Sequence, residues 1–329
     1  MGRLKLSTFL QMRVNVFLYL TFGWKTAKLI LFFLGKLYFF FHKKEKKRII
    51  GAASSALLPD GSGRIPRRLA KEIFNGILSH YYEKMFIAFE TPEKAAHFLN
   101  RHVQKDDLAI LHRKLLAGKG VIIVTGHYGA IEYIPCLLAV NDFPVTMIAR
   151  FNSRKLRDKV HAQAVHYGIK LIDVTEEGNV VKRAIGELRL NRVLITECDE
   201  IEEWRPSRKE KISFLGRMTG LDRTINVIHR RSGAEVLFGV IHRYDLNHYA
   251  LRMYSYEKMA EILGHLEHRS VGETVLKFLE LCILSNPDQW YQWKEYAMMA
   301  APLSKGGTGH IPRRPGMPCE GPVPGYALP

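Results

Sequence analysis

Short apolar runs alternate with amphipathic stretches along the chain after residue 68. Runs of β-branched and aromatic side chains between turn residues predict strands. These strands are Val121–Thr125, Val145–Ala149, Ile169–Val174, Val193–Thr196, Val236–His242 and Tyr249–Tyr254. Helical patterns lie between several of them, at Ser153–Tyr167, Gly178–Leu190 and Asp222–Arg231. This alternation predicts an α/β fold in which helices cover a largely parallel central sheet.

Composition divides the chain into four parts, the first of which is residues 1–50. Residues 51–68 carry Gly, Ser and Pro punctuation that predicts a linker. The α/β domain is predicted over residues 69–301, where Arg68–Phe89 has helical periodicity and Thr91-Pro92-Glu93 begins another helix. Residues 302–329 hold seven of the fourteen prolines and six glycines, so we expect a disordered tail.

The first 50 residues predict a membrane anchor. Val14–Trp24 and Leu29–Phe41 are rich in Leu, Phe and Tyr, but lysines interrupt them, so no run reaches the roughly 20 apolar residues of a clean span. A tilted span and a helix in the membrane plane both remain open. A buried hairpin of a soluble protein is disfavoured because it would expose too many Phe side chains in water. Lys43–Arg48 should hold the rest of the chain on the cytoplasmic side and attract anionic lipids.

Charge and cysteine content exclude other classes of protein. The formal net charge is +17, and residues 1–50 contribute eleven Lys and Arg against the single Glu45. A nucleic-acid-binding face would interleave basic and stacking aromatic residues on a folded surface, so no nucleic-acid partner is predicted. Cys136, Cys198, Cys282 and Cys319 lie far apart without metal-ligand spacing. We therefore predict a reducing compartment, with no structural metal and no cofactor.

A histidine at the end of an apolar strand is the main candidate for chemistry. In Gly120-Val-Ile-Ile-Val-Thr-Gly-His127-Tyr-Gly-Ala-Ile-Glu132 a carboxylate follows His127 by five residues. The same spacing occurs in polar stretches at His102/Asp107 and His268/Glu273, so the spacing alone is weak evidence. Only His127 follows a β-branched run and lies between two glycines.

The predicted local structure allows His127 and Glu132 to meet. Residues five apart on one helix point away from each other, so the histidine must precede the helix. A strand to Thr125, a turn, and a helix over Ala130–Val140 put Glu132 in the first helical turn, within reach of the ring. The carboxylate would fix the tautomer and leave the other nitrogen as a general base for a substrate hydroxyl. The alternative is a structural histidine that caps a strand end.

Two further segments are candidates for binding a phosphate or an oxyanion. Arg150 follows the strand Val145–Ala149, at the sheet edge where ligands of open α/β folds bind. Residues 212–223 combine glycines with Arg217 and Thr219, and backbone amides near those glycines could cradle phosphate. The alternatives are a solvated surface arginine and a plain turn before a helix.

Four short blocks occur in a fixed order along the chain. They are Gly126-His127-Tyr-Gly-Ala-Ile-Glu132, Arg150-Phe-Asn, Phe214-Leu-Gly216-Arg217-Met-Thr219 and Ser285-Asn-Pro-Asp-Gln-Trp-Tyr-Gln-Trp293. Together with the basic N-terminal anchor they resemble the lipid A biosynthesis (late) acyltransferase family, within the lysophospholipid acyltransferase superfamily. The chain departs from the family's usual residues at Ala130-Ile131, where Asn-Trp is common, and at Asp199-Glu200, where Asp-Gln is common.

The resemblance implies a reaction and a set of site residues. His127, held by Glu132, would deprotonate a hydroxyl that attacks an acyl thioester on acyl carrier protein or coenzyme A. Substrate-binding roles fall to Arg150, Phe214, Gly216, Arg217 and Thr219. The implied acceptor is a lipid A precursor at the cytoplasmic side of a bacterial inner membrane. Another lysolipid or amino-acid lipid is the alternative acceptor, and a membrane-anchored binding protein without catalysis is the alternative function. Cys136 is expected to be a buried structural residue.

Overall fold

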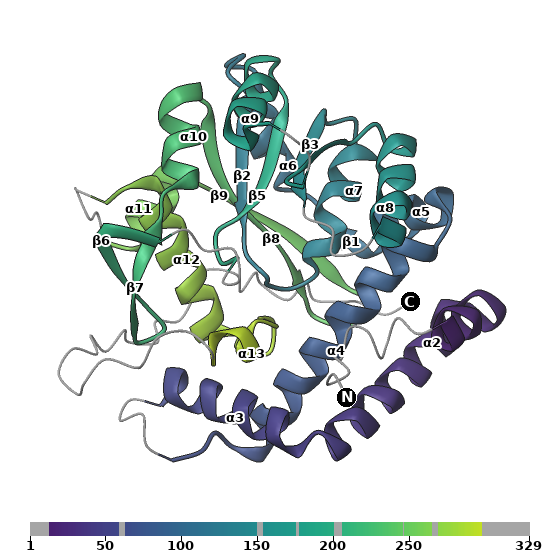
Figure 1. Ribbon diagram of the computed structural model, residues 1–329. Helices are drawn as coiled ribbons and strands as arrows, with labels where there is room; N and C mark the ends of the chain where they lie inside the picture. Colours follow the sequence, from purple (N-terminus) through teal and green to yellow (C-terminus); the bar gives the residue numbers. More distant parts are fainter. Residues whose placement is uncertain are drawn as a thin grey trace.

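A seven-stranded sheet lies at the centre of the protein, shown in the computed structural model of Figure 1. The structure describes residues 13–58, 63–149, 154–175, 178–200, 206–245, 247–264 and 269–297. The sheet has the order β1-β9-β8-β2-β5-β3-β4, and every neighbouring pair is parallel except β8 with β9. Its strands are β1 (Val103–Gln104), β2 (Val121–Thr125), β3 (Val145–Ala149), β4 (Lys170–Asp173), β5 (Val193–Glu197), β8 (Glu235–Arg243) and β9 (Tyr249–Ser255).

Helices bury both faces of this sheet, as its apolar strands predict. Along β2, Ile122 and Val124 join one hydrophobic core, whereas Val121 and Ile123 join the other. The first core includes residues of α9 (Val180–Arg189), α10 (Thr224–Ser232), α11 (Tyr256–Ile262) and α12 (Val271–Ser285). The second includes residues of α5 (Pro92–His102), α6 (Leu108–Leu115), α7 (Ile134–Ala139) and α8 (Arg154–His166). The predicted α/β class with a mostly parallel sheet is confirmed.

One predicted segment has a different structure. Residues 212–223 were a candidate phosphate cradle, with a plain turn before a helix as the alternative, but residues 212–222 belong to an antiparallel hairpin. Its strands are β6 (Pro206–Phe214) and β7 (Arg217–Asp222). Leu215 and Gly216 connect them with φ angles of 51° and 78°, as in the tight turns that suit the twist of a hairpin. The helix α10 begins only after this hairpin.

The predicted helix after β2 is divided in two. A 3₁₀ turn, η1 (Ile131–Tyr133), precedes α7. Pro135 lies at the start of α7, where the missing proline N–H costs no helical hydrogen bond. Glu132 therefore lies in the 3₁₀ turn and not in the first turn of the longer helix that the sequence predicts.

Three long helices form the N-terminal part. They are α2 (Arg13–Phe41), α3 (Lys43–Leu57) and α4 (Arg67–Phe89), and α2 packs against α4 while α3 packs against the short helix α13 (Trp293–Tyr296). The predicted linker over residues 51–68 is helical to Leu57, because Ala52 and Ala53 are buried against the core. Among the described helices, none has both the length and the apolar composition that crossing a bilayer requires. The predicted tail at 302–329 lies outside the described residues.

Candidate active site

A sharp loop at the carboxyl end of β2 carries His127. Gly129 in this loop has a φ of 60°, and a Cβ atom there would lie 2.0 Å from the carbonyl oxygen of Ile241. The backbone approaches β8 this closely because the N–H of Ala130 donates to that same carbonyl oxygen at 2.8 Å. Only glycine fits this position, which explains one of the two glycines that bracket the histidine in the sequence.

The Gln-Trp block near the C-terminal end of the fold closes over this loop. The carbonyl oxygen of Gln289 accepts from the N–H of Gly129 at 2.9 Å, and the N–H of Tyr291 donates to the carbonyl oxygen of His127 at 3.2 Å. Trp290, between them, is fully buried and forms an isolated β-bridge with Tyr128. The first and last of the four sequence blocks, residues 126–132 and 285–293, therefore pack together as two hydrogen-bonded loops.

A buried ion pair braces the same loop from behind. Arg243 donates from Nε and Nη2 to the two carboxylate oxygens of Glu83, at 2.6 and 2.7 Å. Its Nη2 also donates to the carbonyl oxygen of Gly129 at 2.9 Å. Both charged side chains are almost completely buried, and bidentate pairs of this kind fix geometry strongly. The ion pair therefore ties α4 and β8 to the loop that carries His127.

Asp199 holds the ring of His127. Its Oδ1 lies 2.9 Å from Nδ1 of His127, and both carboxylate oxygens accept from the backbone N–H of His127 at 3.0 Å. Oδ2 also accepts from the indole N–H of Trp290 at 2.7 Å, and the side chain is completely buried. A carboxylate in this position places a proton on Nδ1 and directs the Nε2 lone pair outward.

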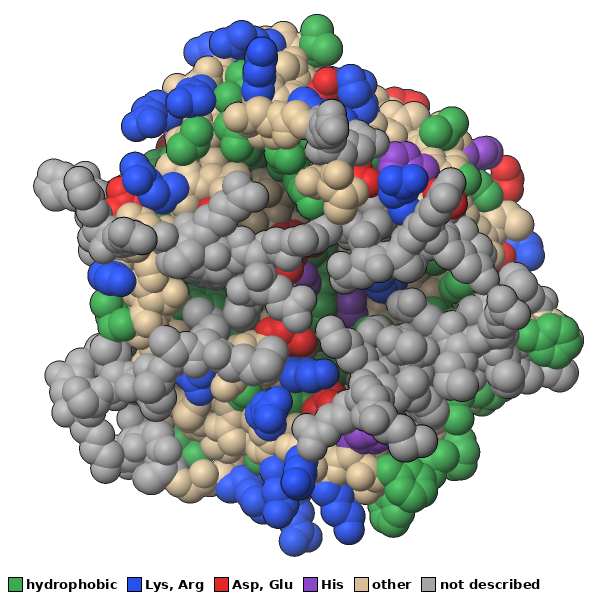
Figure 2. Space-filling model, viewed as in Figure 1, with side chains coloured by type: hydrophobic (Ala, Val, Ile, Leu, Met, Phe, Trp, Pro, Cys, Tyr) green, Lys and Arg blue, Asp and Glu red, His purple; other side chains and the backbone are tan. Residues whose placement is uncertain are grey.

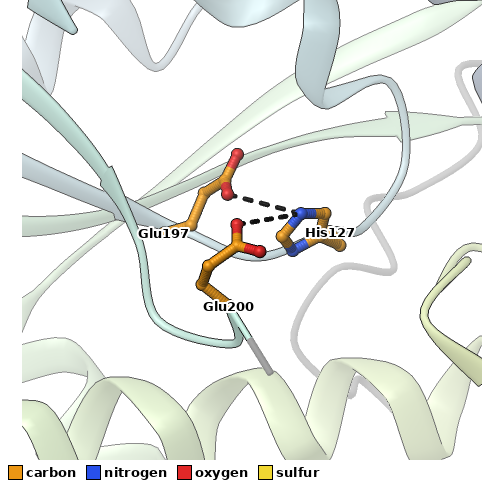
Figure 3. Close-up of side chains that lie close together, drawn as sticks. All are labelled: His127, Glu197 and Glu200. Atoms are coloured by element: carbon orange, nitrogen blue, oxygen red, sulfur yellow. Dashed lines mark ion pairs between the residues drawn. The ribbon is translucent and has the colours of Figure 1, made fainter. Parts of the chain in front are cut away.

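Two glutamates face the other ring nitrogen (Figure 3). Nε2 of His127 lies 3.3 Å from Oε2 of Glu197 and 3.5 Å from Oε2 of Glu200. Glu197 ends β5, which pairs in parallel with β2, so both strands bring their carboxyl ends to the same place. The ring is thus surrounded by three carboxylates from residues 197–200.

These carboxylates change the protonation of the site. Burial by itself lowers the pKa of His127, but the negative charges of Glu197, Asp199 and Glu200 outweigh burial and raise it to about 10. Burial, together with a hydrogen bond to Glu197, raises the pKa of Glu200 to about 8. The carboxylates therefore favour the protonated form of the ring, and His127 becomes better able to accept a proton as pH rises.

The structure assigns Glu132 a different partner from the predicted one. Its Oε1 accepts from Nζ of Lys84 at 3.1 Å and lies 3.8 Å from Nε2 of His80. Nδ1 of His127, which Glu132 was expected to hold, is bonded to Asp199 instead. The 3₁₀ turn directs Glu132 toward α4, and the charge of Glu132 raises the pKa of Lys84. Glu132 still lies near the site. It neighbours His80, whose ring stacks on Tyr291, and Tyr291 forms a T-shaped ring contact with His127.

The predicted substrate-binding residues lie in different places. Arg217 donates from Nη1 to the carbonyl oxygen of Tyr296 at 2.7 Å and stacks on that ring, with Cζ 4.2 Å from its centroid. Phe214 is fully buried beside Trp290, and Gly216 forms the hairpin turn. Thr219 lies on β7, and Arg150 falls outside the described residues. Their roles in substrate binding stay predictions.

The described cysteines have the character of structural residues. Cys136 is buried, and burial followed by the charge of Glu132 raises the pKa of its thiol to about 12. Burial also raises the pKa of Cys198 well above its usual value. Neither thiol forms a thiolate readily, which agrees with the expectation that Cys136 is no nucleophile.

Sequence reasoning overlooked the role of Asp199 although it noted the residue. The available signal was position: Asp199 follows the strand Val193–Thr196 by three residues, and parallel strands bring their carboxyl ends to one edge. Proximity in the sequence favoured Glu132 over a carboxylate 72 residues away.

The fold and the site define an α/β enzyme with a buried, carboxylate-held histidine at the ligand-binding edge of its sheet. The chain belongs to the family of bacterial lipid A biosynthesis acyltransferases, whose pattern matches residues 4–294. It is therefore an acyltransferase, and the family expected from the four sequence blocks is confirmed. A search among curated proteins finds no match to the chain.

Proposed function

We propose that the protein transfers a fatty acyl group from an acyl thioester to a hydroxyl of a lipid A precursor, with His127 as the general base. The observation that carries this proposal is the hydrogen bond between Asp199 and Nδ1 of His127 at 2.9 Å. It leaves Nε2 as the nitrogen that can take a proton from a hydroxyl. Membership of the family supports the class of acceptor.

The reaction follows from the orientation of the ring. Nε2 of His127 removes the hydroxyl proton while the oxygen attacks the thioester carbonyl, so one C–O bond forms. When the tetrahedral intermediate collapses, the C–S bond breaks and the imidazolium returns the proton to the leaving thiolate. Asp199 stabilises the imidazolium between these two steps. Arg150 is the sequence candidate for stabilising the oxyanion.

Glu197 and Glu200 occupy the space that the acceptor hydroxyl needs. The hydroxyl approaches Nε2 from the side where these carboxylates lie at 3.3 and 3.5 Å. Their side chains are 35% and 41% exposed, so they have room to turn toward solvent or to accept hydrogen bonds from the sugar. The donor is carried on acyl carrier protein or coenzyme A, and the mechanism requires only its thioester.

Attachment to the membrane surface belongs to the same proposal. Helix α2 exposes large apolar side chains, and Figure 2 shows hydrophobic side chains along the edge of the molecule where α2 lies. These exposed residues are Phe17, Leu29, Phe33, Leu37, Phe40 and Phe41. Five exposed basic residues begin α3 directly afterwards, at Lys43, Lys44, Lys46, Lys47 and Arg48. An apolar face next to a basic cluster is typical of helices that lie in the membrane interface.

We infer that the enzyme works at the bacterial inner membrane with its catalytic domain on the cytoplasmic side, and the apolar face beside the basic cluster supports this location. Replacing Phe33, Phe40 and Phe41 together with Ser should move the protein from the membrane fraction to the soluble fraction of lysed cells. As a control, Phe39 is buried, so Phe39→Ser should destabilise the fold instead. Unchanged sedimentation of the triple variant, or recovery of the wild type in the soluble fraction at low salt, would contradict the attachment.

Acyl transfer itself is tested with purified protein in detergent. Each assay offers one donor with a labelled acyl group, either the acylated form of acyl carrier protein or acyl-CoA. The acceptors tested are a lipid A precursor, a lysophospholipid and an amino-acid lipid. We expect product with the lipid A precursor and a loss of at least about 10²–10⁴-fold in His127→Ala. His248→Ala, at an exposed surface histidine, is the control and should keep the wild-type rate. An active His127→Ala enzyme would exclude the proposed base, and product only with another acceptor would exclude lipid A.

A further inference from the structure

The His127 ring and two glutamate side chains bring three groups able to bind a metal close together (Figure 3). They are Nε2 of His127 and one carboxylate oxygen each from Glu197 and Glu200, and these atoms all lie within 4.8 Å of one another. His127 and Glu197 follow or end neighbouring parallel strands, whose pairing fixes the backbone that carries them. The cluster was not predictable from His/Cys spacing, because tertiary structure brings its members together.

The spacing of these atoms matches that of a zinc site. Two ligands that bind Zn²⁺ at about 2.1 Å with a tetrahedral angle between them are about 3.4 Å apart. The separations from Nε2 are 3.3 Å to Glu197 and 3.5 Å to Glu200. The two glutamate oxygens lie within 4.8 Å of each other, so small movements of the glutamate side chains bring all three groups to ligand distance of one ion.

The ring is also oriented as a metal ligand. Asp199 accepts a hydrogen bond from Nδ1 at 2.9 Å, which leaves the lone pair of Nε2 directed at the two glutamates. A carboxylate behind a histidine is the usual outer shell of zinc sites, where it fixes the tautomer and makes the ligand more basic. Asp199 is buried and bonded to Trp290 as well, so this support is rigid.

The kind of ion follows from the ligands. One imidazole nitrogen and two carboxylates suit Zn²⁺, whereas Mg²⁺ and Ca²⁺ prefer oxygen ligands alone. The side chains of Glu197 and Glu200 are 35% and 41% exposed, so an ion can enter from solvent. The same exposure leaves room for water as a fourth ligand.

We propose that Zn²⁺ binds to His127, Glu197 and Glu200 and thereby inhibits acyl transfer. The bound ion occupies the Nε2 lone pair, so His127 cannot take the proton of the acceptor hydroxyl. Binding stands on the geometry alone, whereas inhibition rests on the proposed function of His127. Because no covalent bond to carbon forms, removing the ion with a chelator restores the enzyme.

Direct binding is measured by isothermal titration of ZnCl₂ into metal-free, full-length protein in detergent, with MgCl₂ as the comparison ion. We expect one Zn²⁺ per chain and little Mg²⁺ binding. Glu197→Gln and Glu200→Gln should each weaken Zn²⁺ by at least the ~10–100-fold that even an outer-shell partner contributes. Asp245→Asn is the matched control, because it removes a carboxylate beside the exposed His248. It should leave the affinity unchanged.

Inhibition is measured as the Zn²⁺ concentration that halves acyl transfer, relative to each variant's own metal-free rate. This concentration should rise in Glu200→Gln in proportion to the loss of affinity and stay at the wild-type value in Asp245→Asn. The proposal is overturned if wild-type protein shows no saturable binding, if both glutamine variants bind as tightly as wild type, or if bound Zn²⁺ leaves the rate unchanged or raises it. Circular dichroism checks that each variant is folded. A protein without acyl transfer to any acceptor would refute the proposed function, while the titration still decides the binding.

Discussion

Replacing Asp199 with Asn changes one oxygen of a buried carboxylate into an NH₂ group and leaves the size of the side chain nearly the same. Three donors surround this carboxylate: the backbone N–H of His127, the ring N–H at Nδ1, and the indole N–H of Trp290. An amide has one oxygen to offer. Its NH₂ group must therefore face either Trp290 or the His127 ring.

Both orientations have a cost that the contacts define. If the NH₂ group faces Trp290, a buried indole donor loses its acceptor, which costs roughly 1–3 kcal/mol of stability. If it faces the ring, the amide donates to Nδ1 and moves the ring proton to Nε2. The base then has no lone pair for the acceptor hydroxyl, and its contribution of about 10²–10⁴-fold is lost. An aspartate-to-asparagine change in the serine-protease triad lowers the rate by about 10⁴ for the same reason.

We therefore expect kcat/KM of Asp199→Asn to fall by about 10²-fold or more, with KM changed less than kcat. Glu132→Gln is the comparison, because it removes a carboxylate that binds Lys84 instead of the ring. It should cost less than Asp199→Asn. The assay is acyl transfer from a labelled thioester, with thermal unfolding to confirm that each variant is folded at the assay temperature.

The double variant of His127→Ala and Asp199→Asn adds a second readout. It should lose little beyond His127→Ala alone, because residues that act as a unit are not additive. A fully active Asp199→Asn enzyme would refute the reasoning. Glu132 would be the residue that orients the ring if Glu132→Gln were as impaired as His127→Ala while Asp199→Asn were only mildly impaired.

Further changes test the electrostatics and the packing of the site. The carboxylate neighbours of His127 raise its pKa to about 10, so kcat/KM should increase with pH as the ring loses its proton. Glu197→Gln removes one of these charges and should move the increase to lower pH. A pH profile that does not move contradicts the argument. Glu83→Gln leaves the buried guanidinium of Arg243 with a weaker partner, so the free energy of unfolding should fall by up to about 3–5 kcal/mol. Denaturant titration measures this change. A change near zero would show that the ion pair does not stabilise the loop. Gly129→Ala should fail to fold or show no cooperative melting transition. Gly186→Ala, at an open position of a helix, should stabilise the protein by roughly 0.5–1 kcal/mol. Equal behaviour of the two variants would contradict the close approach of Gly129 to β8.

Local patterns in the sequence determined most of the sheet. Val121–Thr125 and Val145–Ala149 match β2 and β3 residue for residue. Such runs are apolar on both faces and end at turn residues, so their conformation depends mainly on near neighbours. The loop that carries His127 was likewise evident from its glycines, because a positive φ such as that of Gly129 is a local property of the backbone. The family followed from four blocks that are each only a few residues long.

Tertiary structure alone decided which carboxylates surround the histidine. Glu132 is close in the sequence, yet the 3₁₀ turn directs it to Lys84, whereas Asp199 reaches the ring from 72 residues away. This happens because β5 inserts between β2 and β3 in the sheet, an order that local patterns do not contain. Arg217 illustrates the same limit, since its contact with Tyr296 depends on how a hairpin packs against α13. Strand order and helix packing are set by long-range burial of apolar surface. The sequence therefore identified the loop that carries the histidine, whereas the packing of distant segments decided which side chains surround it.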